Sequence, residues 1–239
     1  MPLKESGSLK NSVKSKKSNL RKQIESWFWA IVVVIFLRVF VIQAYRIPTG
    51  SMKNTLLPGD FVLAPKFIYG IYVPYLNKKI INFRKPKRGE IVIFTNPLEG
   101  PDLVKRCIGI EGDTIEIINK VVYVNGKPLK EPYVIHTDPE TLPKIEIPNY
   151  QERWERGEFK NFKFARDNFG PIVVPKNTIF VLGDNRDNSY DSRFFGPVSI
   201  KLVKGRPFII YFSYNSKYPL WKFWKALRLK RFFKIVFWS

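Results

Sequence analysis

Ser51 is the residue of this sequence best placed to act as a nucleophile. It lies between a glycine and a methionine in IPTGSMKNTLLPGD, residues 47–60, just after a strongly hydrophobic run. A serine hydroxyl is barely ionised near neutral pH, so a nucleophilic serine needs a neighbouring base. The sequence has a single histidine, His136, so a Ser-His-Asp triad would depend on that one residue. Without a base, the pattern indicates an ordinary loop serine.

Lys105 is the strongest candidate for that base. In the stretch LVKRCI, residues 103–108, strand alternation places Leu103, Lys105 and Cys107 on one face, while Arg106 points away from it. A lysine surrounded by apolar groups loses proton affinity. To act as a base near pH 8, it needs a pKa about two units below 10.4, which destabilises its charge by roughly 3 kcal/mol. The alternative is an edge-strand lysine whose ammonium group reaches solvent.

A cluster of polar side chains follows another apolar strand pattern, in LGDNRDNSYDSRFFGPV, residues 182–198. Its charged members are Asp184, Arg186, Asp187, Asp191 and Arg193. Such a cluster is costly to desolvate unless its members pair, so we expect an ordered network of hydrogen bonds and salt bridges. A calcium loop is disfavoured, because Ser192 stands where such a loop needs glycine and Val198 where it needs glutamate. Nothing fixes two carboxylates at the distance that a glycosidase needs.

The segment before Ser51 reads as a membrane anchor. Residues 27–45, WFWAIVVVIFLRVFVIQAY, would span roughly 28 Å as a helix, close to the thickness of a bilayer core. Aromatic residues stand at both ends, and Arg38 could extend its charge to the interface. The basic leader, residues 1–26, predicts a cytoplasmic N-terminus, with everything after Tyr45 outside. A buried core helix and a cleaved signal peptide are the alternatives, but Ala44 lacks the small partner that a cleavage site needs.

The chain after the anchor, residues 46–219, predicts a mostly β, antiparallel domain with partly closed sheets. Short apolar or alternating runs predict strands at 60–67, 89–95, 103–110, 114–118, 121–124, 178–184 and 206–214. Asn125-Gly126 is a strong hairpin signal. Residues 135–175 lack periodicity and predict an irregular insertion. The tail, residues 220–239, has six basic and no acidic residues among many aromatic ones, which predicts either a segment on an anionic bilayer or a disordered tail.

The overall charge favours an anionic partner. Lysine and arginine outnumber aspartate and glutamate 41 to 20, giving a net charge of +21. Phospholipid and nucleic acid both fit that charge, but an external location and the lack of an RNA-binding motif argue against nucleic acid. One cysteine and one histidine exclude disulfides within the chain and cysteine- or histidine-rich metal sites. We expect no metal, no cofactor and a monomer.

Taken together, the three stretches resemble the boxes of the bacterial type I signal peptidase family, membrane-bound serine proteases that remove signal peptides. IPTGSMKNTLLPGD resembles the nucleophile box, LVKRCIGIEGD the lysine box, and LGDNRDNSYDSRFFGPV the last box, in the same order and after an anchor. GDFVLAPKF fills the segment between the first two boxes. The resemblance covers about residues 27–115 and 178–212, and the combination is far more specific than each box alone.

The resemblance implies roles for individual residues. Ser51 would be the nucleophile and Lys105 the general base, and the oxyanion would be held by the Ser51 N–H and by Thr49. Ser189 would orient the lysine. The supporting residues would be Asp184, Asp191, Arg193 and Arg106. The substrates would be preproteins with small side chains at the first and third positions before the cut, bound as an added strand beside Asp102–Val104 and the segment that leads into Ser51.

Two departures and three rival classes accompany this resemblance. The segment between the lysine box and the last box is shorter than the large second domain of some proteobacterial members, although it is not minimal. The lone Cys107 excludes the disulfide of some relatives. A specialised pilin- or conjugation-type processing peptidase with the same dyad stays open. Self-cleaving repressors are disfavoured because there is no room for a helix-turn-helix domain before Ser51. A catalytically inactive, anchored β protein that binds anionic lipid would have no reason to keep Ser51, Lys105, Thr49 and Ser189 together.

Overall fold

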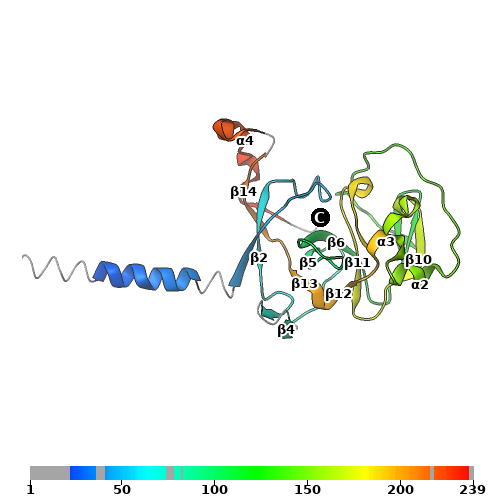
Figure 1. Ribbon diagram of the computed structural model, residues 1–239, viewed down its shortest axis with the longest axis horizontal. Coiled ribbons are helices and arrows are strands. Elements are labelled where there is room, and N and C mark those ends of the chain that lie inside the picture. The colour runs from blue at the N-terminus through cyan, green and yellow to red at the C-terminus, as the bar shows by residue number, and fades with distance from the viewer. Residues whose placement is uncertain (1–21, 36–40, 74–77, 82, 216–217, 237–239) are drawn as a thin grey trace, which may run out of the picture. The chain divides into compact units, whose positions relative to one another are not determined.

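The computed structural model describes residues 22–35, 41–73, 78–81, 83–215 and 218–236. The chain divides into two compact units, Met1–Ile42 and Gln43–Ser239. In the first unit, residues 22–35 form a helix (blue in Figure 1) whose apolar side chains, including Trp27 and Trp29, are exposed. None of the helices in the described ranges has both the length and the apolar character needed to cross a bilayer.

The prediction of one continuous helix over residues 27–45 is wrong at its C-terminal end. Strand β1, Ile42–Arg46, lies next to strand β2, Asp60–Pro65, in a sheet. Two backbone bonds beyond β1 continue the pairing, from Ile47 N to Asp60 O at 2.8 Å and from Gly59 N to Ile47 O at 2.9 Å. Short apolar runs suit a strand as well as a helix, so hydrophobicity alone did not separate the two. Residues 36–40, with Arg38, lie outside the described ranges.

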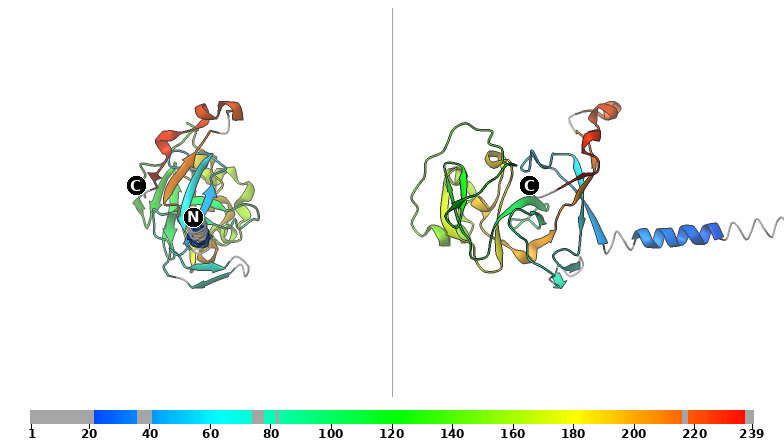
Figure 2. Two further views of the ribbon diagram at one scale, coloured as in Figure 1. Left: turned by 90° about the vertical axis from the view of Figure 1, so that its left-hand side faces the viewer. Right: turned by 180° about the vertical axis from the view of Figure 1, so that it is seen from behind.

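The second unit is built from antiparallel sheets, as predicted. The central five-stranded sheet has the order β12-β11-β6-β5-β13, and the sheet that contains β1 has the order β1-β2-β14-β15 (Figures 1 and 2). A third sheet has the order β10-β7-β8-β9, and β3 pairs with β4. The remaining strands are β3 Ile71–Val73, β4 Lys78–Ile81, β5 Ile91–Phe94, β6 Leu103–Ile110, β7 Thr114–Ile118, β8 Val121–Val124, β9 Lys127–Pro128, β10 Phe169–Val173, β11 Thr178–Leu182, β12 Val198–Ser199, β13 Val203–Gly205, β14 Ile209–Ser213 and β15 Lys234–Ile235.

All seven predicted strands are present, and three of them have the predicted bounds. Alternation or a short apolar run marked β6, β7 and β8 at both ends. The Asn-Gly hairpin is also confirmed, because Val124 pairs with Lys127 across the turn. Asn125 and Gly126 have positive φ angles of 53° and 76°, which is the geometry that this dipeptide favours.

The prediction of an irregular insertion over residues 135–175 is wrong for its second half. That half contains helix α2, Tyr150–Glu155, two 3₁₀ turns, Glu158–Asn161 and Lys163–Arg166, and strand β10, which pairs with β7. Trp154 and Phe159 are fully buried in a core cluster with residues of β6, β7 and β11. This core consists largely of aromatic side chains that do not recur at a regular interval in the sequence. Hydrophobic periodicity therefore did not predict it.

The tail is ordered where it is described, so the disordered alternative is wrong there. It forms a 3₁₀ turn at Leu220–Lys222, helix α4 at Phe223–Ala226, a 3₁₀ turn at Leu229–Arg231 and strand β15. β15 pairs with β14, and Val236 joins the core cluster under β2. Five large apolar side chains in the described part of the tail are nevertheless exposed: Trp221, Trp224, Leu229, Phe233 and Ile235.

Candidate active site

Ser51 and Lys105 come together in the folded chain, although 54 positions separate them. The Lys105 Nζ lies 2.7 Å from the Ser51 Oγ, and both side chains are buried. Burial lowers the pKa of Lys105 from 10.5 to about 8. The charges of Asp191 and Asp184 oppose this shift, and the charge of Arg193 adds to it. A lysine in this state is neutral in an appreciable fraction of molecules near pH 8, and it is within reach of the serine proton.

The position of Lys105 follows from the place of β6 in the central sheet. β6 is paired on both sides, with Val92 of β5 opposite Lys105 and Leu182 of β11 opposite Arg106. Lys105 and Arg106 point to opposite faces of the strand, as predicted, but both faces are covered. Arg106 is therefore fully buried as well, which alternation alone did not reveal.

Ser51 is positioned by a tight turn between β1 and β2. Leu56 N donates to Met52 O at 2.8 Å, and the buried side chains of both residues lie in the core cluster under β2. The residue after Asp184 holds the turn from the other side. Asn185 N donates to Ser51 O at 3.0 Å, and its side-chain amide donates to Gly50 O at 3.1 Å.

Thr49 lies beside the nucleophile. Its Oγ1 is 3.4 Å from the Ser51 Oγ, and the residue is exposed. A hydroxyl at this place can donate to an oxygen of a substrate that approaches Ser51. The geometry is thus compatible with the predicted oxyanion role of Thr49, which stays a prediction.

Asp184 and Arg106 form a buried ion pair next to the dyad. The guanidinium donates to both carboxylate oxygens at 2.8 Å, and both side chains are at most 1% exposed. Thr55 Oγ1 donates to Asp184 Oδ2 at 2.5 Å, which links the pair to the turn of Ser51. The guanidinium also lies over the ring of Tyr133, 3.6 Å from its centre. The expected network is therefore present at this end.

Asp191 and Arg193 form a second buried pair. Arg193 donates to the two Asp191 oxygens at 2.8 and 2.9 Å, and it donates to the carbonyls of Arg166 and Arg186. Burial alone would raise the pKa of Asp191, but the charge and hydrogen bonds of Arg193 outweigh it, so the pKa is lowered. The Asp191 carboxylate also accepts from Gly183 N at 3.1 Å, which fixes the end of β11.

Ser189 and the nucleophile turn both lie against Gly183. A Cβ at Gly183 would lie 2.2 Å from the Ser189 Oγ and 2.6 Å from the Ser51 carbonyl oxygen, so only glycine fits there. Within the described part of the chain, the Ser189 hydroxyl has no partner in good hydrogen-bond geometry, although it contributes to the low pKa of Asp191. Its predicted role in orienting Lys105 stays a prediction.

His136 lies away from the dyad, and two residues of the site, Thr55 and Gly183, were not predicted. His136 lies 3.4 Å from Asp187, which also accepts from two backbone N–H groups of the insertion, so His136 is not the base of Ser51. Thr55 and Gly183 were overlooked. Thr55 stands inside the nucleophile stretch, and Gly183 stands beside Asp184 in the polar stretch 182–198, so the sequence places both next to residues that were predicted. Among the described residues, no group of three His, Cys, Asp or Glu side chains is arranged to hold a metal.

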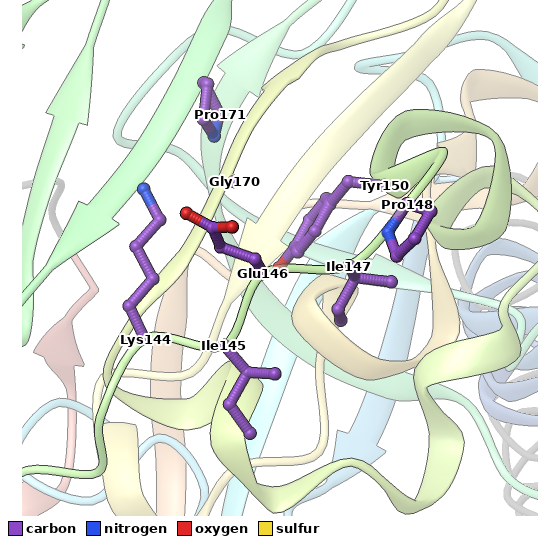
Figure 3. A pocket seen from close by; sticks show the side chains of 8 residues that line it. All are labelled: Lys144, Ile145, Glu146, Ile147, Pro148, Tyr150, Gly170 and Pro171. Carbon is purple, nitrogen blue, oxygen red and sulfur yellow. The ribbon is translucent and has the colours of Figure 1, made fainter.

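The insertion carries a hollow of its own. Figure 3 shows residues 144–148 on one side of it, Gly170 and Pro171 on the other, and the ring of Tyr150 beside it. Its volume is about 580 Å³. None of the predicted site residues lines it. The dyad, in contrast, is assembled from the turn before β2 and from β6.

The comparisons with a family model and with curated proteins agree. The sequence model of the family described as "Signal peptidase, peptidase S26" matches residues 20–212. A signal peptidase I of Pseudomonas fluorescens is 34% identical over 208 residues, which cover 80% of this chain and 72% of that protein. A signal peptidase I of Aquifex aeolicus is 34% identical over 234 residues, 81% of this chain and 85% of that protein. A solved signal peptidase I from Enterococcus faecalis, 30% identical, covers 52% of this chain and 97% of its own with a TM-score of 0.37.

Proposed function

Because this chain belongs to the family of signal peptidases, peptidase S26, which are serine endopeptidases, we propose that it removes signal peptides with a Ser51–Lys105 dyad. One observation carries the assignment of the dyad. The Ser51 hydroxyl lies 2.7 Å from a buried lysine whose pKa is lowered to about 8. No other serine is needed, since this pair already combines a nucleophile with a base of suitable proton affinity.

The reaction would proceed in two steps. Neutral Lys105 Nζ takes the proton of the Ser51 Oγ as this oxygen attacks the scissile carbonyl carbon. The Ser51 N–H and the Thr49 hydroxyl would donate to the oxyanion, and each such donor is typically worth about 10²–10³ in rate. The C–N bond then breaks as Lys105 gives its proton to the leaving amine, which leaves an acyl-enzyme. Water, deprotonated by Lys105, hydrolyses the ester and restores Ser51.

The substrate would bind as an extended strand. Leu103 and Val104, at the start of β6, are only partly buried and directly precede Lys105. The segment from β1 to Ser51 runs up to the same dyad. A peptide between these two segments would place its scissile bond at Ser51, with small side chains at the first and third positions before the cut.

The membrane would be the place of action. We place the N-terminus in the bacterial cytoplasm and the catalytic unit, as a monomer, on the outer face of the cytoplasmic membrane. The exposed tryptophans and basic residues of the tail support contact with anionic phospholipid. Aromatic side chains with a polar edge favour the interface, and lysine and arginine favour anionic headgroups.

Cleavage of a preprotein with alanine at the first and third positions before the cut tests the proposal. The wild-type chain, Ser51→Ala and Lys105→Ala are compared in detergent micelles, and the products are identified by mass spectrometry. We expect one cut after the small residue in the wild type and none in the two variants. Equal cleavage by all three would refute the dyad. A wild type that cleaves only pilin-like substrates would favour the specialised processing peptidase.

A further inference from the structure

The end of the chain folds back over the turn that carries Ser51. Strand β15 pairs with β14, where Lys234 lies opposite Ile210, and Val236 is buried in the same cluster as Met52 and Leu56 of the turn. The family match ends at residue 212, so this segment lies beyond the part that the family model describes. The question is what the segment does for the site.

Arg231 makes the closest link between the segment and the turn. Its guanidinium donates to Asp60 Oδ1 at 3.0 Å, to Asp60 Oδ2 at 2.6 Å and to the Thr55 carbonyl oxygen at 3.0 Å. Asp60 is fully buried, and the Arg231 side chain is 13% exposed. Asp60 also accepts from Leu57 N at 2.8 Å and from the Ser213 hydroxyl at 2.6 Å. One carboxylate thus joins the end of the turn, β14 and the tail.

Thr55 is held from its other side by the active site. Its hydroxyl donates to Asp184, and Asp184 holds Arg106, the neighbour of Lys105 on β6. The Thr55 backbone oxygen and side-chain oxygen therefore connect the tail to the dyad through Asp184. Arg231 itself contacts neither Ser51 nor Lys105 in these bonds.

We infer that Arg231 is a positioning residue, which fixes the nucleophile turn by bridging Asp60 and the Thr55 carbonyl. The inference rests on the proposed function, because it concerns the placement of Ser51 relative to Lys105. Displacement of a reacting group by about 1 Å can cost about a hundredfold in rate. Removal of the guanidinium leaves the buried Asp60 carboxylate with only the more distant cation of Arg228, whose Nη1 lies 3.9 Å from Oδ1, and it removes the bond to the Thr55 carbonyl.

The guanidinium is required for its shape as well as its charge. Two atoms of Arg231 reach Asp60, and one of them also reaches Thr55 O. A lysine is a point charge on a flexible stem, and it can keep the charge at Asp60 but not this planar bridge. Arg231→Lys is therefore the conservative variant, and Lys230→Ala, at the exposed neighbouring position, is the matched control.

The test measures cleavage of the preprotein above by the full-length chain in micelles, with kcat and KM determined separately from pH 6 to 9. For Arg231→Ala we expect kcat to fall by about ten- to a hundredfold, with KM within about twofold and an unchanged apparent pKa of the pH profile. Arg231→Lys should fall between this variant and the wild type, and Lys230→Ala should match the wild type. A merely structural role would lower the amount of active enzyme but leave kcat per active site unchanged.

Hydrogen exchange of the amides of residues 52–57 gives a readout that does not depend on catalysis. Faster exchange there in Arg231→Ala, with unchanged exchange in the central sheet, supports the inference. Unchanged kcat and exchange in a folded Arg231→Ala would overturn it. If Arg231→Ala does not fold, Arg231→Lys decides in the same way. An inactive wild type would refute the proposed function instead, and the exchange data alone would then decide on Arg231.

Discussion

Each face of strand β6 buries a cation, and the two cations differ in how their charge is compensated. Lys105 is 3% exposed and donates to a neutral hydroxyl, and burial lowers its pKa to about 8. Arg106, the next residue, is fully buried but makes two hydrogen bonds to Asp184 and one to Gly89 O. The two buried cations therefore differ in whether a carboxylate binds them directly. The Asp184 carboxylate binds Arg106 directly and compensates its charge. It does not bind Lys105 in this way, so burial lowers the pKa of Lys105 and the amine can act as a base.

Replacement of the Lys105 amine by a guanidinium should have the largest effect on activity. In Lys105→Arg, a guanidinium replaces the amine, and it stays protonated at every accessible pH, so it cannot take the serine proton. We expect activity to fall by about 10⁴-fold or more, as for the loss of a member of a catalytic triad. Single-turnover cleavage at pH 9 measures the residual rate. Activity within a hundredfold of the wild type would show that Lys105 is not the base.

Removal of Arg106, the cation that pairs with Asp184, should have the next largest effect. Arg106→Met leaves the buried Asp184 carboxylate without its guanidinium, and we expect a loss of about 3–5 kcal/mol in the free energy of unfolding. Urea titration followed by circular dichroism measures it. Arg156→Met is the control, because that side chain is 63% exposed in its ion pair, and it should cost less than about 1 kcal/mol. Equal losses in both variants would contradict the comparison.

Removal of the Lys105 charge should change the free energy of unfolding in the opposite direction. Lys105→Met should be inactive but more stable than the wild type by up to about 3 kcal/mol at pH 7, because the cost of a buried charge disappears. The folded pKa is about 8 and the unfolded value 10.5, so wild-type stability should rise with pH between these values. The two proteins should therefore converge above pH 10. A less stable Lys105→Met would show that the Lys105 charge is compensated after all.

The pH profile of kcat/KM should show the smallest effect, and it measures the pKa of Lys105 most directly. For the wild type, kcat/KM should rise about tenfold per pH unit below pH 8 and level off above it, since only neutral Lys105 acts as a base. A preprotein without a titratable group near the cut serves as substrate. A rising limb centred near pH 6 would instead indicate a histidine, and His136→Gln would then identify it.

The sequence singled out Ser51 and Lys105, whose side chains the fold brings within 2.7 Å of each other, because both residues stand in local patterns. Alternation in LVKRCI separated Lys105 from Arg106, and the turn residues marked the end of the nucleophile stretch. What alternation could not predict is that the second face of β6 is covered too. That depends on Tyr133 and Asp184, which come from distant segments and reach Arg106 only in the fold.

The missed parts of the fold have a common cause. Ile42–Arg46 pairs with β2, Trp154 completes a core under β6, and Lys234–Ile235 adds a strand to β14. Each of these segments is ordered by contacts with residues far away in the chain, and each is too short or too irregular to show a period. Composition pointed instead to an anchor, an insertion and a tail.

The bridge between Arg231 and Asp60 has a consequence for the biogenesis of the enzyme. It joins residues that lie 171 positions apart, and the chain is made from its N-terminus. Ser51 and Lys105 would thus emerge long before the residue that steadies the nucleophile turn. On the inference drawn for Arg231, a prematurely ended chain would carry Ser51 and Lys105 without this bridge, and its peptidase activity should stay below that of a chain that includes Arg231.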